Sequence, residues 1–539
     1  MKRIIPIITV LLLIFALFAG CAAQSGVTAD KGTQTSTAAA AVSSDTSGDD
    51  EMFTDRDLEI GYSEADSTII TLSDGATDIS GSGAKAEDNT ITISEEGTYI
   101  LTGSLLSGQI IVDAADDAKI QMVLNDADIT NETSAAIYVK NADKVFITTA
   151  SGSENSLSVT GEFVAIDDNN IDGAIFAKSD LTLNGAGSLT IVSKYGHGIV
   201  SKDDLAVTSG TYVITAAKQG LSGKDSVRIA DGTFTIEAGT DGIHSENEDD
   251  TTLGFVYISG GTITIAAGDD GIHAEPYVSI LGGTISISES YEGIEGLAID
   301  ISGGDISVVS SDDGLNAAGG KDQSGGMGGG GMGATDGAYI DISGGTLSID
   351  ASGDGIDSNG DLTVSGGMTT VSGPTDSGNG TIDYAGTASV TGGTLLGAGS
   401  SGMAEGFGEN STQGSILYNL TSTQQAGTKV SLKDADGNVI AEFTPVKQFQ
   451  SVNISVPALV SGSTYTLVVG SEEYSVELSS IAYSNGGGMT DKMGGGGQGG
   501  GMGGGQQPQG GSGGGPGGGG QAPQGNLSSD ATSSATVAQ

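Results

Sequence analysis

A glycine-centred motif recurs through the middle of the chain and places acidic residues at fixed positions. The residue directly before the glycine is acidic in five copies, namely Asp241, Asp270, Glu292, Asp313 and Asp354. Two residues after the glycine, the same copies hold His244, His273, Glu295, Asn316 and Asp357. Glu246 and Glu275 also match each other two residues further on. The spacing therefore predicts stacked carboxylates on one outer face of a repeating fold, about 5 Å apart.

Stacked carboxylates repel one another unless a cation lies between them, and Ca²⁺ prefers several oxygen ligands. The pattern predicts calcium as a cofactor, with ligands at Asp241, Glu246, Asp270, Glu275, Glu292, Glu295 and Asp313. The alternative is a purely structural Asp-Gly turn in which glycine supplies a positive φ. The matched Glu246 and Glu275 favour calcium, because a turn alone does not require them.

Two histidines and a set of lysines are candidates for carbohydrate contacts. His244 and His273 should stack on the outer face, where a sugar-contacting polar pair is favoured over a transition-metal site. Lys178, Lys202 and Lys224 follow one another at steps of 24 and 22 residues. In so acidic a chain, this second ladder predicts contacts with a carboxylated sugar. The alternative is that these lysines only balance neighbouring aspartates.

The motif is part of a longer repeat that must position these side chains. Its glycine falls at positions 198, 220, 242, 271, 293, 314 and 355, mostly 21 or 22 residues apart. The two longer steps contain an acidic insertion and a glycine-rich insertion. A period near 22 with short strands is typical of a solenoid. Period-two alternation sends Ile263 and Ile265 inward, so we expect an all-β fold of stacked parallel coils.

Composition and local patterns divide the chain into five parts. Residues 1–20 have the layout of a signal peptide, and the sequence LFAGCAAQ resembles the bacterial lipobox, which implies lipidation of Cys21. Residues 21–66 are expected to form a flexible tether. Residues 67–410 form the predicted solenoid, 411–484 a small β cap or β domain, and 485–539 a disordered Gly/Gln/Met-rich tail. We therefore expect a cell-surface protein held on the membrane by lipid.

The net charge of the whole chain is −49. A chain this acidic repels nucleic acid, so nucleic acid is excluded as a partner.

Three long segments carry a resemblance to a known family. They are GTYILTGSLLSGQIIVDAADDAKIQMVLNDADITNETSAAIYVKNADKVFITTASGSENSLS, the DGIH and GGTITI coils, and TPVKQFQSVNISVPALVSGSTYTLVVG. Together they resemble bacterial surface carbohydrate-binding domains with a polysaccharide-lyase-like β-helix. The resemblance implies a right-handed parallel β-helix, binding of cellulose or pectin-like polymers, and calcium held by acidic coil corners between positions 241 and 313.

Three functions compete on this evidence. The first is a lipid-anchored protein that binds plant or cell-wall polysaccharide without catalysis. The second is a calcium-dependent polysaccharide lyase, which needs a base near the acidic ladder. No Lys or Arg lies between positions 229 and 320, which counts against the lyase. The third is a structural surface spacer or adhesin.

Overall fold

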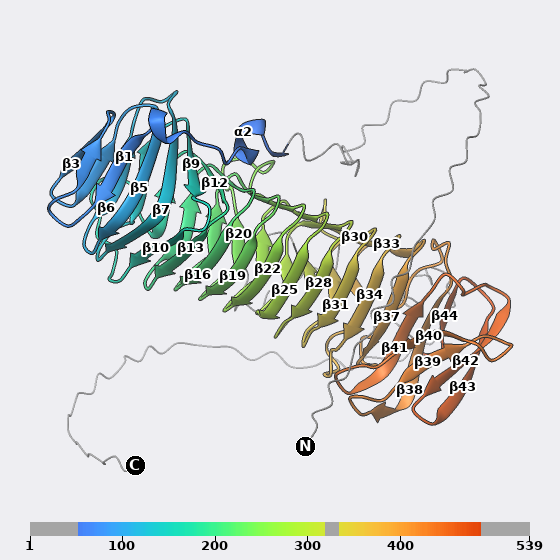
Figure 1. Cartoon of the computed structure of the whole chain (residues 1–539). Helices are drawn as coiled ribbons and strands as arrows, with labels where there is room; N and C mark the ends of the chain where they lie inside the picture. Colours follow the sequence, from blue (N-terminus) through green and yellow to red (C-terminus); the bar gives the residue numbers. More distant parts are fainter. Residues whose placement is uncertain (1–51, 319–333, 487–539) are drawn as a thin grey trace, which may run out of the picture. The chain divides into compact units, whose positions relative to one another are not determined.

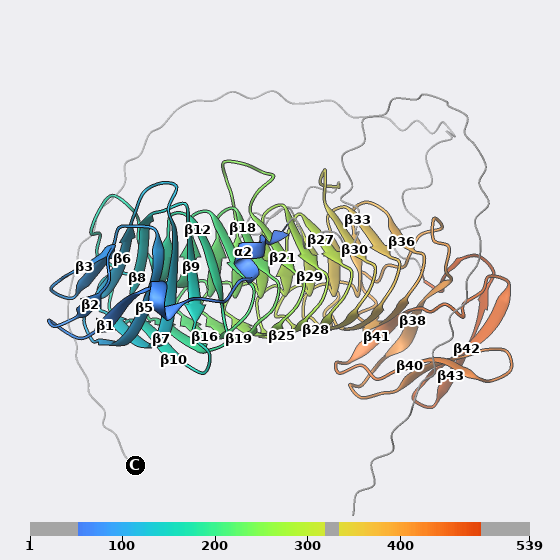
Figure 2. The ribbon, with the colours of Figure 1, turned by 45° about the horizontal axis from the view of Figure 1, so that its top comes forward.

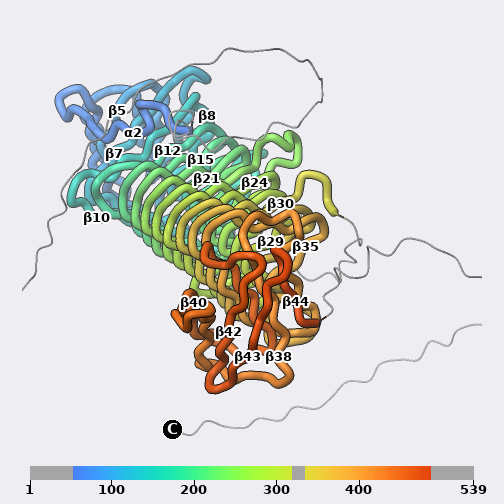
Figure 3. The backbone as a smooth tube through the Cα atoms, turned by 90° about the vertical axis from the view of Figure 1, so that its right-hand side faces the viewer, coloured from blue at the N-terminus to red at the C-terminus, as the bar shows by residue number. Residues whose placement is uncertain are grey.

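The chain folds into stacked three-sided coils, as a computed structural model describes it for residues 52–318 and 334–486 (Figure 1). The strands of the coils pair in parallel with those of the next coil, and the tube trace in Figure 3 shows the coils one behind another. This arrangement confirms the predicted all-β class and the parallel β-helix. The predicted signal peptide, Cys21 and nearly all of the predicted tail lie outside the described residues.

Each coil contributes one short strand to each of three faces. The first face is a 13-stranded sheet that begins with β3 (Ala84–Glu87) and β4 (Thr90–Ile93). Its further strands, one from each coil, are β6 (Gln109–Asp113), β8 (Ile137–Asn141), β11 (Gly173–Ala177), β14 (His197–Ser201), β17 (Leu221–Gly223), β20 (Ile243–Ser245), β23 (Ile272–Ala274), β26 (Ile294–Glu295), β29 (Leu315–Ala317), β32 (Ile356–Ser358) and β35 (Asp383–Tyr384). The second face comprises β9 (Lys144–Thr149), β12 (Asp180–Gly185), β15 (Asp204–Val207), β18 (Ser226–Ile229), β21 (Phe255–Ile258), β24 (Tyr277–Ile280), β27 (Ala298–Ile301), β30 (Tyr339–Ile342), β33 (Asp361–Val364) and β36 (Ala388–Val390). The third face comprises β10 (Glu154–Val159), β13 (Ser188–Ser193), β16 (Thr211–Ala216), β19 (Thr233–Ala238), β22 (Thr262–Ala267), β25 (Thr284–Glu289), β28 (Asp305–Val309), β31 (Thr346–Asp350), β34 (Met368–Ser372) and β37 (Thr394–Gly399).

Two smaller groups of strands flank these coils along the chain. The N-terminal group consists of β1 (Thr68–Leu72), β2 (Asp78–Ser80), β3 (Ala84–Glu87), β4 (Thr90–Ile93), β5 (Gly97–Leu105) and β7 (Lys119–Asn131). The C-terminal group consists of β38 (Ser415–Gln424), β39 (Val430–Lys433), β40 (Val439–Phe443), β41 (Phe449–Ser455), β42 (Ser463–Val469), β43 (Glu472–Leu478) and β44 (Ala482–Ser484).

Straight ladders of buried side chains from all three faces form the core, and those of the third face show the pattern. Ile263 pairs with Phe234 on one side and Ile285 on the other, and Ile265 pairs with Ile236 and Ile287. All of these side chains are buried. The alternation predicted from the sequence therefore holds, because a shift of one residue would turn the whole apolar set toward solvent.

The motif glycine is required for space rather than for its backbone angles. At Gly242 a Cβ atom would lie 2.5 Å from Ile265 Cγ2 and 2.7 Å from the carbonyl oxygen of Gly271. Positive φ angles occur instead at the Gly-Gly turns, for example Gly261 with φ 93°. The Asp-Gly turn considered as an alternative expected a positive φ at the motif glycine, whereas the positive φ is found at the Gly-Gly turns. The absence of a side chain at the motif glycine therefore lets this turn of the coil pack directly against the buried isoleucines of the third face.

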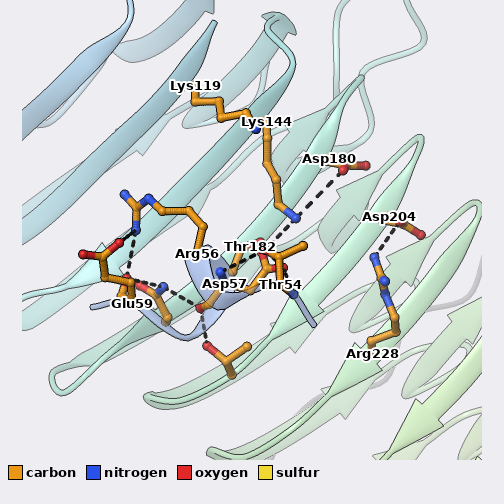
Figure 4. A network of polar contacts seen from close by, with 12 residues as sticks. Thr54, Arg56, Asp57, Glu59, Lys119, Lys144, Asp180, Thr182, Asp204 and Arg228 are labelled. Carbon is orange, nitrogen blue, oxygen red and sulfur yellow. Dashed lines mark hydrogen bonds and ion pairs between the residues drawn. The ribbon is translucent and has the colours of Figure 1, made fainter. Parts of the chain in front are cut away.

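A short segment before the first strand packs on the second face (Figure 2). It contains α2 (Asp55–Leu58), which has a capping box at Thr54, and is followed by the turn η1 (Glu64–Asp66). Phe53 packs against Tyr257, with ring centroids 6.3 Å apart. Asp57 lies among side chains of the second face and is buried (Figure 4). The tether predicted for residues 21–66 is therefore wrong for this docked part, because residues 52–58 are held by specific contacts.

The C-terminal group closes the end of the third-face ladder. Strand β41 pairs antiparallel with β37, and β38 pairs antiparallel with β41. The strands β40, β39, β42 and β43 form a separate four-stranded sheet. Because β41 covers the last coil strand, this group acts as a cap on the solenoid. Within residues 52–318 and 334–486, no helix is long and apolar enough to cross a membrane.

Candidate functional site

Three rows of side chains run along the outer side of the first face, and they contain every residue predicted from the motif. The turn row precedes the motif glycine and comprises Gln219, Asp241, Asp270, Glu292, Asp313 and Asp354. The strand row comprises Ser222, His244, His273, Glu295, Asn316, Asp357 and Asp383, which are register partners along the sheet. The edge row follows each strand and comprises Lys178, Lys202, Lys224, Glu246 and Glu275.

The turn and strand rows are buried or half-buried, whereas the sequence predicted an exposed face. Asp270, His273 and Glu295 are only 4%, 2% and 4% exposed. The side chains do point away from the apolar core, as alternation predicted. They are buried because each row stacks its side chains on one another and the neighbouring row covers them laterally. Buried charges must be paired or neutralised, so the charges in these rows determine which protons or cations the rows can bind.

A histidine-centred cluster occupies the middle of the strand row. His273 Nδ1 lies 3.1 Å from Asp270 Oδ2 and 2.8 Å from Glu295 Oε2. Burial lowers the pKa of His273, but the two carboxylates outweigh it and raise that pKa well above its usual value. Burial raises the pKa of Asp270 to about 8. The proton on His273 Nδ1 can be donated to only one of the two carboxylates at a time. The second carboxylate therefore needs a further proton or a cation to neutralise it.

The neighbouring histidine has its own carboxylate partners. His244 Nδ1 lies 2.8 Å from Asp241 Oδ2, and its Nε2 lies 3.6 Å from Glu246 Oε2. Burial raises the pKa of Asp241, but the hydrogen bond and charge of His244 more than offset it, so the pKa is lowered. The rings of His244 and His273 stack with centroids 4.9 Å apart, as predicted. This end of the site is thus a set of histidine–carboxylate pairs.

An all-oxygen cluster lies further along the same rows. Ligand oxygens of Asp313, Asp354 and Asp357 all lie within 4.8 Å of one another. Burial raises the pKa of Asp313 to about 9, that of Asp354 to about 8 and that of Asp357 to about 7. The motif placed Asp354 and Asp357 on these rows, but neither was among the predicted calcium ligands.

A glycine leaves room beside this cluster. A Cβ at Gly353 would lie 2.3 Å from Asp312 Oδ1 and 2.3 Å from Asp313 Oδ1, so only glycine permits the two oxygens to converge there. Asn316, which is 5% exposed, carries a buried Oδ1 that has no hydrogen-bond partner. Its Nδ2 donates to Glu292 Oε2 at 2.5 Å. These oxygens fit a hard cation such as Ca²⁺.

The remaining predicted ligands, Glu246 and Glu275, lie on the edge row and belong to neither group of converging ligand atoms. Glu275 has a buried Oε2 without a hydrogen-bond partner. Sequence reasoning did not identify Asp312, Asp383 and Glu405 as part of the acidic region. Burial, together with the negative charge of Asp383, raises the pKa of Glu405 to about 7. Asp312 could have been found from the sequence, because it directly precedes the motif residue Asp313. Glu405 lies outside the repeat, so no pattern in the sequence indicated it.

The lysines predicted as a second ladder belong to the same row as the glutamates. Gly223 pairs with Ser245, so Lys224 and Glu246 are consecutive on the edge row. Lys202 and Lys224 line a pocket of about 290 Å³ together with His244 and Glu246. Lys202 Nζ lies 5.5 Å from the ring centre of Phe176. Lys178 is exposed at the start of the row.

Between positions 229 and 320 the coils of the acidic ladder have no Lys or Arg of their own, yet a basic neighbour lies beside the ladder. Lys224 comes from the adjacent coil, which a sequence window restricted to 229–320 does not include.

Comparison with known proteins finds similarity to proteins that are described as carbohydrate-binding or polysaccharide lyase-like. Residues 87–338 match the model of a family described as carbohydrate-binding domain-containing protein. A relative with the same description, from Acetivibrio thermocellus, is 34% identical over 136 residues, which are 25% of this chain and 48% of the relative. The chain thus spans about half the length of that relative. A solved structure of the polysaccharide lyase-like protein from C. thermocellum, a gadolinium derivative, is 31% identical and matches 46% of this chain and 99% of its own, with a TM-score of 0.40.

Proposed function

We propose that this chain, whose residues 87–338 match the carbohydrate-binding domain-containing family, binds an acidic, pectin-like polysaccharide outside the cytoplasm. The observation that carries the proposal is the pocket between Lys202 and Lys224 on the first face. Two ammonium groups in one open pocket suit the carboxylate of a uronic acid residue. Repeated coils then present this chemistry along a polymer.

The lysines, rather than the acidic rows, are the proposed contacts for the polymer. Asp270 and Glu295 are too deeply buried to reach a bound chain. Lys178 and Lys202 are exposed, and Lys224 reaches Asp249 Oδ2 at 2.6 Å on the rim of the pocket. A carboxylated ligand can exchange for Asp249, because that carboxylate is mostly exposed and its pairing with Lys224 is weak.

Calcium is proposed as a structural cation of the acidic rows. Asp313, Asp354 and Asp357 would hold it, with Asp312 nearby, since these residues supply only oxygen ligands. When bound, the ion would supply the positive charge that the described coils lack between positions 229 and 318, where there is no Lys or Arg. At the other end, His244 and His273 would neutralise Asp241, Asp270 and Glu295. Of the calcium ligands predicted from the sequence, this proposal keeps Asp313 and adds Asp354 and Asp357.

Lipid anchoring through Cys21 places the domain at the cell surface in this proposal. Substituting Cys21→Ala should release the protein from the membrane fraction and abolish incorporation of labelled palmitate. Incorporation of palmitate that persists in Cys21→Ala would contradict the anchor and leave the binding proposal intact.

Polysaccharide binding is tested by sedimentation of the secreted-domain protein with insoluble polygalacturonate and with cellulose. We expect the wild type to bind polygalacturonate, and the Lys202→Ala/Lys224→Ala double variant to lose most of that binding. Lys429→Ala is a matched control, since Lys429 is an exposed lysine that pairs with Glu442 in the cap. Added NaCl should weaken binding by screening, whereas a chelator should not, which separates the lysine route from a calcium bridge.

Equal binding by the wild type and the double variant would contradict the assigned pocket. Failure of the wild type to bind any polysaccharide would favour a surface spacer or adhesin.

A further inference from the structure

A second, larger pocket lies beside the first face and is not built from the repeat. It has a volume of about 500 Å³, and the residues that matter for its chemistry are Phe163, Asn169, Asn170, Asp172, Tyr195 and Lys218. Most of its wall comes from the loop 160–172 between β10 and β11, and the rest comes from the corners before β14 and β17. A pocket of this size accommodates a sugar unit.

The loop is held in place before any ligand binds. The hydroxyl of Tyr138, on β8, donates to Asp167 Oδ2 at 2.7 Å and accepts from Asn169 Nδ2 at 2.7 Å. Gly196 lies so close to the loop that a Cβ there would be 2.5 Å from Phe163 Cε2 and 2.1 Å from the carbonyl oxygen of Asp172. The pocket is therefore preformed, which reduces the entropy lost on binding.

Two features of the pocket wall point to a sugar. The ring of Tyr195 is 51% exposed, the largest exposed fraction among the aromatic residues of the described chain. An exposed ring gives an apolar surface against which the carbon–hydrogen face of a pyranose can pack. Asp172 Oδ1 is buried and has no hydrogen-bond partner. The other oxygen, Oδ2, accepts a hydrogen bond from Asn170 Nδ2 at 3.4 Å and lies 3.6 Å from His197 Nε2.

We propose that this pocket binds a neutral pyranose residue, stacked on Tyr195 and hydrogen-bonded to Asp172. The Asp172 carboxylate is a hydrogen-bond acceptor on the pocket wall, and a sugar hydroxyl can donate to it. A uronate carboxylate has no proton to donate at neutral pH and would be repelled by Asp172. Lys218 can donate to a ring or hydroxyl oxygen of the same sugar. This inference rests on the proposed polysaccharide binding and adds a neutral subsite to the acidic one.

Calorimetric titration of the whole secreted domain tests the subsite. The probes are the neutral hexasaccharides of cellulose, xylan and mannan, with hexagalacturonate as the acidic probe. We expect Tyr195→Ala to bind the preferred neutral probe roughly tenfold more weakly, because an aromatic contact is lost. Tyr195→Phe should bind it as the wild type does, since the ring remains. Asp172→Leu should also weaken neutral binding while leaving hexagalacturonate affinity unchanged.

The control is Tyr339→Ala, which removes a tyrosine that is 37% exposed on β30 of the second face. It should bind the neutral probe with wild-type affinity. The inference is overturned if the wild type binds hexagalacturonate but no neutral probe, or if Tyr195→Ala binds the neutral probe as tightly as the wild type. If the wild type binds none of the probes, neutral or acidic, the proposed function fails together with this subsite.

Discussion

Asp57 Oδ1 lies 2.8 Å from Lys144 Nζ, although Asp57 precedes the solenoid and Lys144 begins the second-face strand β9 (Figure 4). The same carboxylate oxygen accepts a hydrogen bond from Thr182 at 2.5 Å, and the carbonyl oxygen of Asp57 accepts one from Thr208 at 2.8 Å. Both Asp57 and Lys144 are buried. The pair therefore attaches the segment before β1 to three successive coils.

Removing the charge of Asp57 should release this segment. In Asp57→Asn the ammonium of Lys144 loses its closest partner, and Asp180 at 3.9 Å replaces it poorly. We expect local docking to weaken by about 2 kcal/mol, less than for a fully isolated buried charge. Hydrogen exchange at residues 52–66 should accelerate, while exchange in the third-face strands stays slow. Unchanged exchange at 52–66 would show that the packing of Phe53 and the backbone hydrogen bonds of Asp57 hold the segment without this charge.

The same ion pair should make docking pH-dependent. Burial raises the pKa of Asp57, but hydrogen bonds from Lys144, Thr182 and Thr54 outweigh it and hold the pKa at about 2, against 3.8 in a free chain. Because the folded pKa is depressed, the stabilisation is complete above pH 3.8 and is lost as the pH falls toward 2. The loss amounts to about 2 kcal/mol at most. Exchange measured between pH 5 and pH 2 should show this step in the wild type and not in Asp57→Asn.

The motif glycines should be intolerant of a single methyl group. At Gly271 a Cβ would lie 2.6 Å from the carbonyl oxygen of Gly293 and 2.6 Å from Ile287 Cδ1. Gly271→Ala should lower the free energy of unfolding by about 1–3 kcal/mol through overpacking. Gly61→Ala is the control, since nothing lies within 4 Å of a Cβ there. Equal urea midpoints for the two variants would mean that the corner relaxes freely.

The repeat and its register could be predicted from the sequence because they follow from local periodicity. Alternation fixes which face Ile263 and Ile265 occupy, and the glycine spacing fixes which residues are neighbours along the rows. The stacking of His244 on His273 follows from the same count. Parallel coils repeat these relationships without any long-range information.

Burial of the acidic rows and the docked segment could not be predicted in the same way. Whether His273 is exposed depends on side chains of three rows packing together, which periodicity does not report. The segment around Asp57 has only a four-residue helix and no repeat, so its partners on the second face leave no pattern in the sequence. The pocket at Tyr195 depends on a loop that occurs once.

Calcium should stabilise the native state through the all-oxygen cluster. A chelator should lower the melting temperature and added Ca²⁺ should restore it, because an ion bound only by the folded chain adds stability. Asp354→Asn/Asp357→Asn should remove most of this difference, whereas Asp436→Ala, in the exposed turn between β39 and β40, should retain it. A melting temperature that is the same with chelator and with millimolar Ca²⁺ would rule out the cation.

Lyase activity is the sharpest alternative, since Lys202 and Lys224 bring a candidate base beside His244. Elimination requires a base that is neutral near the working pH. Lys224 is not such a base, because its hydrogen bond to Asp249 raises its pKa and keeps the ammonium charged. We therefore expect polygalacturonate with Ca²⁺ to yield no unsaturated product absorbing in the ultraviolet, even at pH 9. Turnover that disappears in Lys202→Ala and persists in Lys429→Ala would instead identify an enzyme with Lys202 at its active site.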